Sequence, residues 1–261
     1  MAPKNPSKTD PIDHANAKSL VDFERDYLPP RSSYTPYGIP PGEVDISLHT
    51  PETLSSAELT MLLDLVAKTS GKHYRASTWG WNQRKKRAEM RLRDLKYLVV
   101  RGRNARGDEK GEEKVDGDEV GRDQAVVGKK RKRTTDEDVN AEKQTPNPEE
   151  TQKPEILGFA SFMPTYEDGK KVIYVYEIHL EEQLRGTKLS QTLMSLIQHA
   201  AEKIPGVEKV MLTCFTANAA ARRFYERLGY EVDEFSPEPR VMRGGKEVRA
   251  DYVILSRGVR G

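Results

Sequence analysis

The chain of 261 residues has a single cysteine, Cys214, and no long hydrophobic run. One cysteine excludes an internal disulfide and a zinc site built from several cysteines. Cys214 lies in the apolar run VMLTCF, where a small buried residue is expected rather than a nucleophile. No stretch approaches the roughly 18 apolar residues of a membrane helix. The start, MAPKNPSKTDP, lacks the apolar core of a signal peptide. These absences predict a soluble intracellular protein without membrane contact.

The chain is also poor in apolar residues, and the shortage is concentrated in one segment. Hydrophobic residues are 36% and charged residues 32% of the chain. Residues 103–153 contain no aromatic residue and no Leu, Ile or Met, so they bury too little apolar surface to offset their ordering entropy. We expect a long disordered insertion there. Its run KKRKR (129–133) is typical of a nuclear localisation signal, with a charge-balanced linker as the alternative. The predicted location is nucleus and cytoplasm.

Hydrophobic periodicity predicts an α/β fold with a mixed sheet. Residues 1–42 are expected to hold a weakly helical segment (11–28) and a Pro-rich stretch without regular structure. Residues 43–257 are expected to form the main domain. Its predicted strands are 43–49, 96–102, 156–164, 172–180, 209–215, 230–235 and 247–257, with a turn at 165–171. Its predicted helices are 55–68, a basic run ending at Leu92 and expected to be a solvated face, 189–204 and 218–228.

The loop EEQLRGTKLS (181–190) joins a predicted strand to a predicted helix. A helix N-terminus presents unpaired backbone N–H groups and the positive end of the helix dipole, which suits a pyrophosphate. Arg185 and Lys188 would add positive charge. The loop alone is equally compatible with an ordinary strand-to-helix turn.

The following segment, FTANAAARRFYERLGYEVDEF, resembles the C-terminal half of the GNAT acetyltransferase superfamily. The resemblance implies a GNAT fold, with a mixed, mainly antiparallel sheet flanked by helices, and acetyl-CoA as co-substrate without a metal. The family loop reads Arg/Gln-x-x-Gly-x-Gly/Ala, and here Lys188 and Ser190 stand at its small positions. Tyr225 aligns with a family tyrosine near the sulfur, although a core aromatic is an alternative. The implied cofactor residues are Leu180, Arg185, Gly186, Thr187, Lys188, Leu189, Ser190, Asn218 and Tyr225.

Three segments show a narrower similarity, to the N-alpha-acetyltransferase 40 family: HYRASTWGWNQRKKRAEM, YVYEIHLE and KVMLTCFTANAAARRFYERLGYEVDEFSP. That family acetylates the N-termini of histones H-four and H-two-A, whose tails begin Ser-Gly-Arg-Gly. These tails are therefore the implied partners, and no direct nucleic-acid binding is expected. The implied site residues are Tyr74 and Trp79 in the peptide groove, Tyr174, Tyr176 and Glu177 at the reacting amine, and Glu167 and Asp168 around the substrate arginine.

Direct attack of an amine on a thioester requires the amine to be neutral. A free α-amine has a pKa of about 8, against about 10.4 for lysine. One carboxylate, acting directly or through a water, is therefore enough to deprotonate it. Glu177 is the candidate. Strand alternation puts Tyr174 and Tyr176 on one face and Glu177 on the other, unless the strand bulges.

Several alternatives remain open from the sequence. Trp79 and Trp81 could be core anchors, Glu167 and Asp168 could form a polar hairpin tip, and His179 is expected to be structural. Two other functions also remain, a lysine acetyltransferase of the same fold and a non-catalytic histone-binding module.

Overall fold

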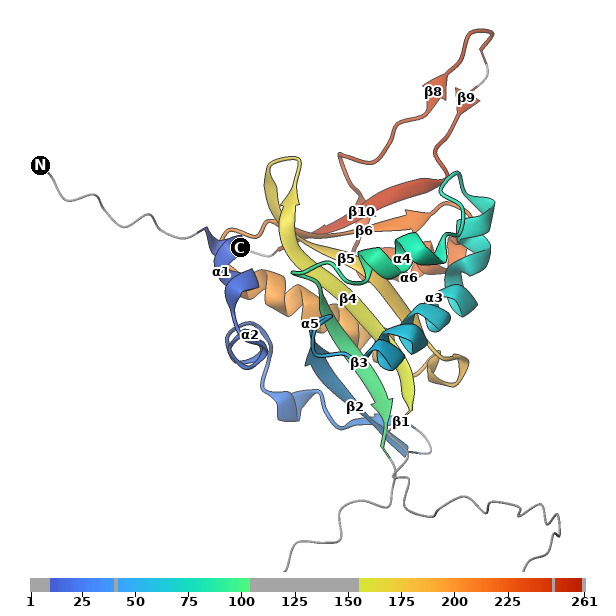
Figure 1. Ribbon diagram of the computed structural model, residues 1–261. Coiled ribbons are helices and arrows are strands. Elements are labelled where there is room, and N and C mark those ends of the chain that lie inside the picture. Colours follow the sequence, from blue (N-terminus) through green and yellow to red (C-terminus); the bar gives the residue numbers. More distant parts are fainter. Residues whose placement is uncertain (1–9, 40–41, 104–154, 246, 260–261) are drawn as a thin grey trace, which may run out of the picture. The chain divides into compact units, whose positions relative to one another are not determined.

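The computed structural model describes residues 10–39, 42–103, 155–245 and 247–259, all within one compact unit. The predicted insertion and its KKRKR run lie outside these residues, apart from Arg103. The main sheet has the strand order β1-β2-β3-β4-β5-β6-β10-β7 (Figure 1). Among the described strands, only β5 and β6 pair in parallel, which confirms the predicted α/β, GNAT-like, mainly antiparallel sheet. Its strands are β1 (Tyr37–Ile39), β2 (Gly42–His49), β3 (Lys96–Gly102), β4 (Ile156–Glu167), β5 (Lys170–Leu180), β6 (Lys209–Phe215), β7 (Glu231–Val232) and β10 (Tyr252–Gly258).

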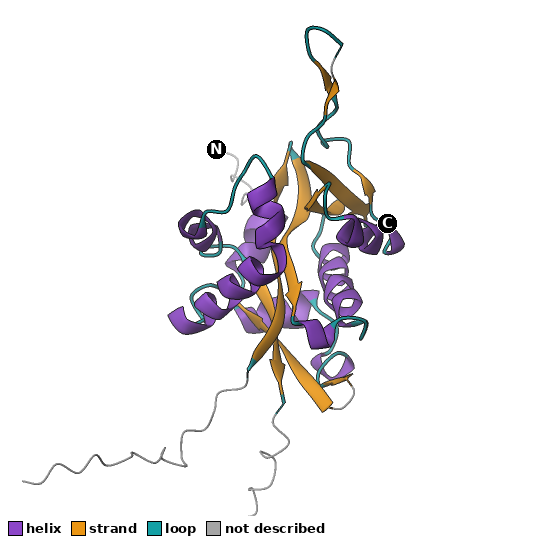
Figure 2. Ribbon diagram, turned by 90° about the vertical axis from the view of Figure 1, so that its right-hand side faces the viewer, coloured by secondary structure: helices purple, strands orange, loops and turns teal. Residues whose placement is uncertain are grey.

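Helices cover both faces of this sheet (Figure 2). The helices are α1 (Pro11–Ala17), α2 (Leu20–Tyr27), α3 (Ser56–Ala76), α4 (Gln83–Glu89), α5 (Leu189–Lys203) and α6 (Ala219–Arg227). On β3, Leu98 and Val100 join the core beneath α1, α2 and α5, whereas Tyr97 and Val99 join the core beneath α3. A central strand buried on both faces needs apolar residues at every position. This explains why the sequence there is a continuous apolar run.

The N-terminal segment packs into the main core. Residues 11–28 form two helices rather than one, because Ser19 caps α2 by accepting a hydrogen bond from the Asp22 N–H. The prediction that the Pro-rich stretch has no regular structure is wrong. Tyr37–Ile39 pairs with β2 as an edge strand, and Arg31–Ser33 forms a 3-10 turn. An edge strand tolerates flanking prolines because one of its sides needs no hydrogen-bond partner.

Phe23 links this segment to the sheet. Its ring is fully buried and lies 5.0 Å from the Tyr27 ring and 6.2 Å from the Phe162 ring. We expect Phe23→Ala to lower the free energy of unfolding by about 3–5 kcal/mol, measured by urea denaturation. Val21 on the same helix is 74% exposed, and Val21→Ala should change stability by less than about 0.5 kcal/mol. Equal effects of the two substitutions would show that α2 is not part of the cooperative core.

Several element boundaries differ from the predictions. The predicted turn at 165–171 contains only Asp168 and Gly169, with φ of 47° and 81°, as a two-residue type I′ hairpin requires. Helix α3 continues past residue 68 to Ala76. The predicted strand 230–235 is reduced to β7. The predicted strand 247–257 is interrupted at residues 249–251, where the Asp251 carboxylate accepts a hydrogen bond from the Thr78 N–H at 2.5 Å. The first part of that strand pairs in a separate ribbon of β8 (Arg240–Val241) and β9 (Glu247–Val248).

Candidate active site

A β-bulge in β5 determines which side chains face α3. Ser161 pairs with Glu177 and the next β4 residue, Phe162, pairs with Val175, so Tyr176 is the extra residue. The bulge reverses the alternation, and Tyr176 and Glu177 both lie on the face toward α3. From the sequence, Glu177 could reach the reacting amine only if the strand bulges, and the structure contains that bulge. A β-bulge turns the following side chain to the other face of its strand.

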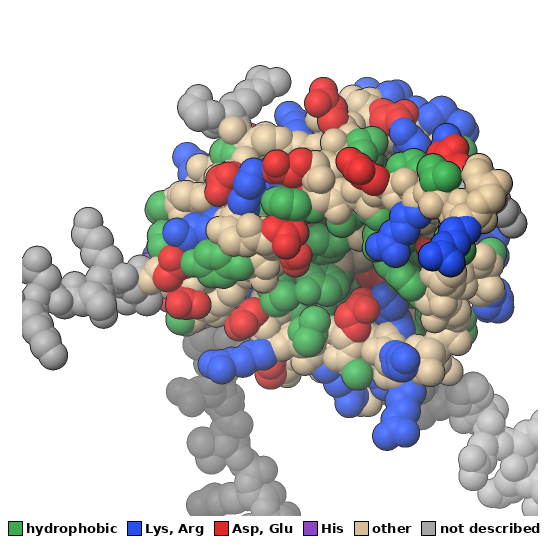
Figure 3. Space-filling view, turned by 90° about the horizontal axis from the view of Figure 1, so that it is seen from above, with side chains coloured by type: hydrophobic (Ala, Val, Ile, Leu, Met, Phe, Trp, Pro, Cys, Tyr) green, Lys and Arg blue, Asp and Glu red, His purple; other side chains and the backbone are tan. Residues whose placement is uncertain are grey.

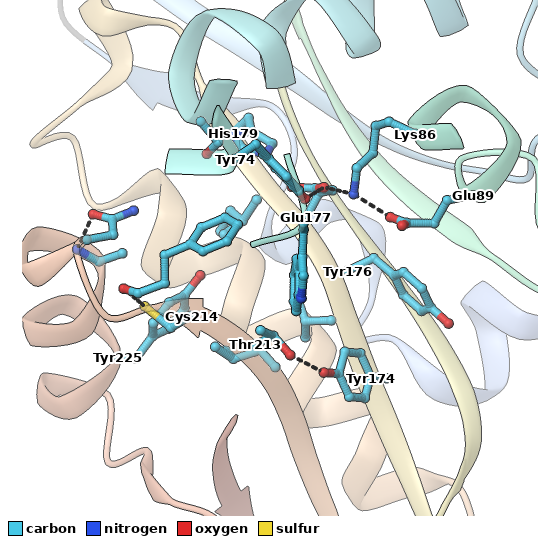
Figure 4. Close-up of a pocket in the computed structure, with 18 residues that line it drawn as sticks. Tyr74, Lys86, Glu89, Tyr174, Tyr176, Glu177, His179, Thr213, Cys214 and Tyr225 are labelled. Atoms are coloured by element: carbon cyan, nitrogen blue, oxygen red, sulfur yellow. Dashed lines mark hydrogen bonds and ion pairs between the residues drawn. The ribbon is translucent and has the colours of Figure 1, made fainter. Parts of the chain in front are cut away.

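The cavity begins where β5 and β6 part. These strands are hydrogen-bonded only as far as Val175 and Leu212, although both continue. Between them opens a cavity of about 270 Å³, lined by side chains from α3, α4, α6 and both strands (Figure 4). Figure 3 shows a hollow on one face of the molecule, with hydrophobic side chains lining it and charged side chains around it. The cavity collects the predicted residues Tyr74, Trp79, Tyr174, Tyr176, Glu177, Asn218 and Tyr225.

Glu177 is the most strongly bound carboxylate of this cavity. Its Oε1 accepts hydrogen bonds from Lys86 Nζ at 2.8 Å and Tyr74 Oη at 3.0 Å. Its Oε2 accepts from His179 Nε2 at 2.5 Å. Burial alone would raise the pKa of Glu177, but the Lys86 ammonium and His179 outweigh it and lower that pKa to about 2. The side chain is thus a fixed, ionised carboxylate.

Lys86 and Glu89 belong to the site but were not predicted. The basic run around them was expected to be a solvated helix face, and for Lys86 this is wrong, because its side chain is only 8% exposed. Its Nζ also donates to Glu89 Oε1 at 2.6 Å and lies 4.8 Å from the centre of the Tyr74 ring. Lys86 stands four residues before the buried Met90. Residues four apart lie on the same face of a helix, so this spacing could have predicted that Lys86 faces the interior.

His179 also lines the cavity, although it was expected to be structural. Since the Glu177 carboxylate only accepts, Nε2 must carry the hydrogen of their shared bond. Nδ1 lies 2.6 Å from the Thr69 hydroxyl, whose oxygen is also 2.7 Å from the Leu65 carbonyl. The extension of α3 beyond its predicted end brings Thr69 and Tyr74 to β5.

Aromatic side chains form the outer wall. Trp79 is half exposed, with its ring 5.5 Å from Phe215 and 4.9 Å from Tyr252, so it is not a core anchor. Tyr174 shares a 2.5 Å hydrogen bond with Thr213, whereas the Tyr176 hydroxyl has no hydrogen-bond partner within the described residues. Burial, followed by the charge of Glu89, raises the pKa of Tyr176 to about 12, so its hydroxyl stays protonated. Trp81 is partly buried beside the α3 core.

The β5–α5 loop fits the pyrophosphate of acetyl-CoA. From Gly186 to Ser190, no backbone N–H makes a hydrogen bond within the described residues, so the start of α5 offers free donors. Lys188 is exposed and has φ +66°, which explains why the family pattern has a small residue there. Tyr37 donates to the Thr187 carbonyl at 2.9 Å and so ties β1 to this loop.

The remaining predicted cofactor residues surround this loop and the cavity. Arg185 is exposed beside the loop, whereas Leu180 and Leu189 are buried at the adjoining ends of β5 and α5. Asn218 caps α6, its side chain accepting from the Ala221 N–H at 3.2 Å. Tyr225 is buried in the cavity wall next to Cys214, and burial raises the pKa of both groups. Free donors, exposed cations and a cavity between the parted strands together suit the two ends of acetyl-CoA.

The two predicted arginine-binding acids do not line the cavity. Glu167 is partly buried at the end of β4, and burial, followed by the charge of Asp168, raises its pKa. Its own charge contributes to the raised pKa values of Tyr174 and Tyr176, so it lies near that pair. Asp168 is exposed in the hairpin turn.

The described residues include no cluster of His, Cys, Asp and Glu that could hold a metal ion. Across the same ranges, every helix is too short or too polar to cross a membrane.

Comparison with known proteins agrees with this architecture. Residues 132–230 match the family model described as "Acetyltransferase (GNAT) family", which together with the fold confirms the resemblance to the GNAT acetyltransferases. The chain is also similar to N-alpha-acetyltransferase 40 of Saccharomyces cerevisiae, with 33% identity over 102 residues. That alignment covers 32% of this chain and 36% of the relative, so the chain spans about a third of the curated relative that it matches.

Solved structures show a more distant similarity. NAA60 of Arabidopsis thaliana, in complex with a bisubstrate analogue, has a TM-score of 0.46 at 12% identity, covering 82% of this chain and 99% of that one. The ribosomal-protein-S18-alanine N-acetyltransferase of Escherichia coli has a TM-score of 0.40 at 13% identity, covering 82% and 94%.

Proposed function

We propose that this protein transfers the acetyl group of acetyl-CoA to the N-terminal amine of a peptide, and that its substrates are the tails of histones H-four and H-two-A. The observation that carries the proposal is the buried Glu177 carboxylate, which accepts hydrogen bonds from Lys86, Tyr74 and His179 at the point where β5 and β6 part. The GNAT family match supports acetyl-CoA as the donor. The similarity to N-alpha-acetyltransferase 40 supports an α-amine as the acceptor.

In this mechanism acetyl-CoA would supply an activated thioester, and the chain would bind and orient the amine. Glu177 attracts the incoming ammonium, and the tyrosine hydroxyls of the wall limit its orientation. A carboxylate with a pKa of about 2 holds a proton poorly. Glu177 therefore aligns the amine and a water that carries the proton away, rather than storing that proton. The acetyl carbon would exchange its bond to sulfur for a bond to the amine nitrogen, and coenzyme A would leave as the thiol. Because burial keeps Tyr225 protonated, its hydroxyl would be available as a hydrogen-bond donor to that sulfur.

The proposed substrate suits the cavity mouth. A tail beginning Ser-Gly-Arg-Gly has a small first residue and a glycine, which suit a cavity of about 270 Å³ whose lining includes Tyr74 and Trp79. The arginine adds a cation that Glu167 would pair with. Histone tails as partners, and a nuclear and cytoplasmic location through KKRKR, are part of this proposal.

A pair of peptides tests the acceptor. With acetyl-CoA, we expect Ser-Gly-Arg-Gly-Lys to be acetylated on its α-amine, and an N-terminally blocked copy to give no product above background, as located by mass spectrometry. Acetylation of the blocked peptide on lysine would instead identify a lysine acetyltransferase. Absence of acetyl-CoA binding at high micromolar concentration in calorimetry would identify a non-catalytic module.

A further inference from the structure

Lys86 is a buried cation with no role in the mechanism above. Its ammonium lies between two carboxylates, 2.8 Å from Glu177 and 2.6 Å from Glu89. Removing a cation from water is costly unless it is paired and hydrogen-bonded. A lysine that is 8% exposed at the wall of a cavity is therefore held there by these two partners.

Helix α4 fixes the position of Lys86 at both ends. Asn82 caps its start by accepting from the Lys85 N–H at 2.9 Å. At its end, the Tyr97 hydroxyl donates to the Met90 carbonyl at 2.7 Å. The neighbouring Lys85 is exposed and has no carboxylate within ion-pair distance among the described residues. Lys86 alone of this pair is directed at Glu177.

Lys86 also determines the charge of the acid cluster. Among Glu177, Glu89 and Lys86, the ammonium offsets one of the two carboxylate charges and reduces the repulsion between them. Without this ammonium, burial would raise the pKa of Glu177, and mainly His179 would oppose that rise. The titratable groups that face Glu177 are Tyr74 on α3, Lys86 and Glu89 on α4, Tyr97 on β3, His179 on β5 and Tyr225 on α6.

We propose that Lys86 is a positioning residue of the acetyl-transfer site, which holds the Glu177 carboxylate charged and in one orientation so that it receives the substrate amine. The inference rests on the proposed function and adds a residue to it. Lys86 does not touch the reacting atoms and acts through Glu177.

The test compares Lys86→Met, which removes the charge and keeps an unbranched side chain that is one atom shorter, with Lys85→Met as the matched control and Lys86→Arg as the conservative variant. Titration of the Glu177 carboxyl is followed by ¹³C NMR without substrate. In the wild type the lowered pKa keeps Glu177 ionised at every pH above its midpoint of about 2. In Lys86→Met, the ammonium no longer offsets the effect of burial on the Glu177 pKa. The titration midpoint of Glu177 should therefore rise above the ordinary glutamate value of about 4.3. Lys85→Met should titrate like the wild type.

Kinetics give the second measurement. Lys86→Met should lower kcat by about 10- to 100-fold, with the acetyl-CoA Kd unchanged in calorimetry, and Lys86→Arg should recover most of the loss. Lys86→Gln, which keeps a donor without the charge, replaces the Met variant if that one does not fold. A wild type that acetylates no N-terminus would overturn the proposed function. An unchanged Glu177 titration or an unchanged kcat in Lys86→Met would overturn the role of Lys86 alone.

Discussion

Glu177→Gln is expected to lower kcat roughly 100-fold or more while leaving acetyl-CoA binding intact. The substitution keeps the size of the side chain but removes a charge that three donors hold in place, from Lys86, Tyr74 and His179. The neutral amide no longer attracts an ammonium or aligns a water for its proton. Steady-state kinetics with Ser-Gly-Arg-Gly-Lys, together with calorimetry of acetyl-CoA, measure the two effects separately.

Glu89→Gln is the matched control. Glu89 lies in the same cavity and shares Lys86, but all three donors to Glu177 remain when it is neutralised. We expect a loss in kcat of less than about 10-fold. A larger loss at Glu89 than at Glu177 would transfer the amine-binding role to Glu89.

The second large effect concerns the substrate arginine. Glu167→Ala is expected to weaken the binding of Ser-Gly-Arg-Gly-Lys by about 2 kcal/mol, or roughly 30-fold, because a charge pair gains most where water is partly excluded. Glu167 meets that condition, since it is partly buried near Tyr174 and Tyr176. A peptide with Ala in place of the Arg should bind the wild type and the variant alike. Peptide binding is measured by calorimetry.

Asp168→Asn provides the comparison. Asp168 is exposed at φ 47°, and Asn tolerates this left-handed backbone, so the charge is removed without straining the turn. An exposed ion pair contributes less than about 1 kcal/mol, and we expect Asp168→Asn to weaken peptide binding by less than that. If Glu167→Ala still prefers the Arg peptide as strongly as the wild type does, arginine is recognised elsewhere or not at all.

Local patterns predicted much of the fold because they depend on short-range geometry. The predicted helix start near residue 55 is confirmed, because Ser55 caps α3 and forms the capping box with Glu58. The apolar run 96–102 became a strand buried on both faces. Alternation along YVYE made the position of Glu177 conditional on a bulge, and the register shift between β4 and β5 meets that condition. The errors fall where tertiary contacts override local preference, at the edge strand Tyr37–Ile39 and at the continuation of α3 to Ala76.

The sequence by itself determined the class of fold and the loop that precedes α5, because periodicity and residue type are local properties. Its resemblance to the acetyltransferases indicated Glu177 and the tyrosines of the cavity, but not Glu89. Only the tertiary structure decided which lysine of a basic run is buried, since Lys86 is 91 residues from Glu177 in sequence. It also decided that Tyr37 reaches Thr187, 150 residues away, and that β5 and β6 separate after Val175. The physical reason is that a charge is buried only where a compensating partner meets it, and residues far apart in sequence meet only through the fold.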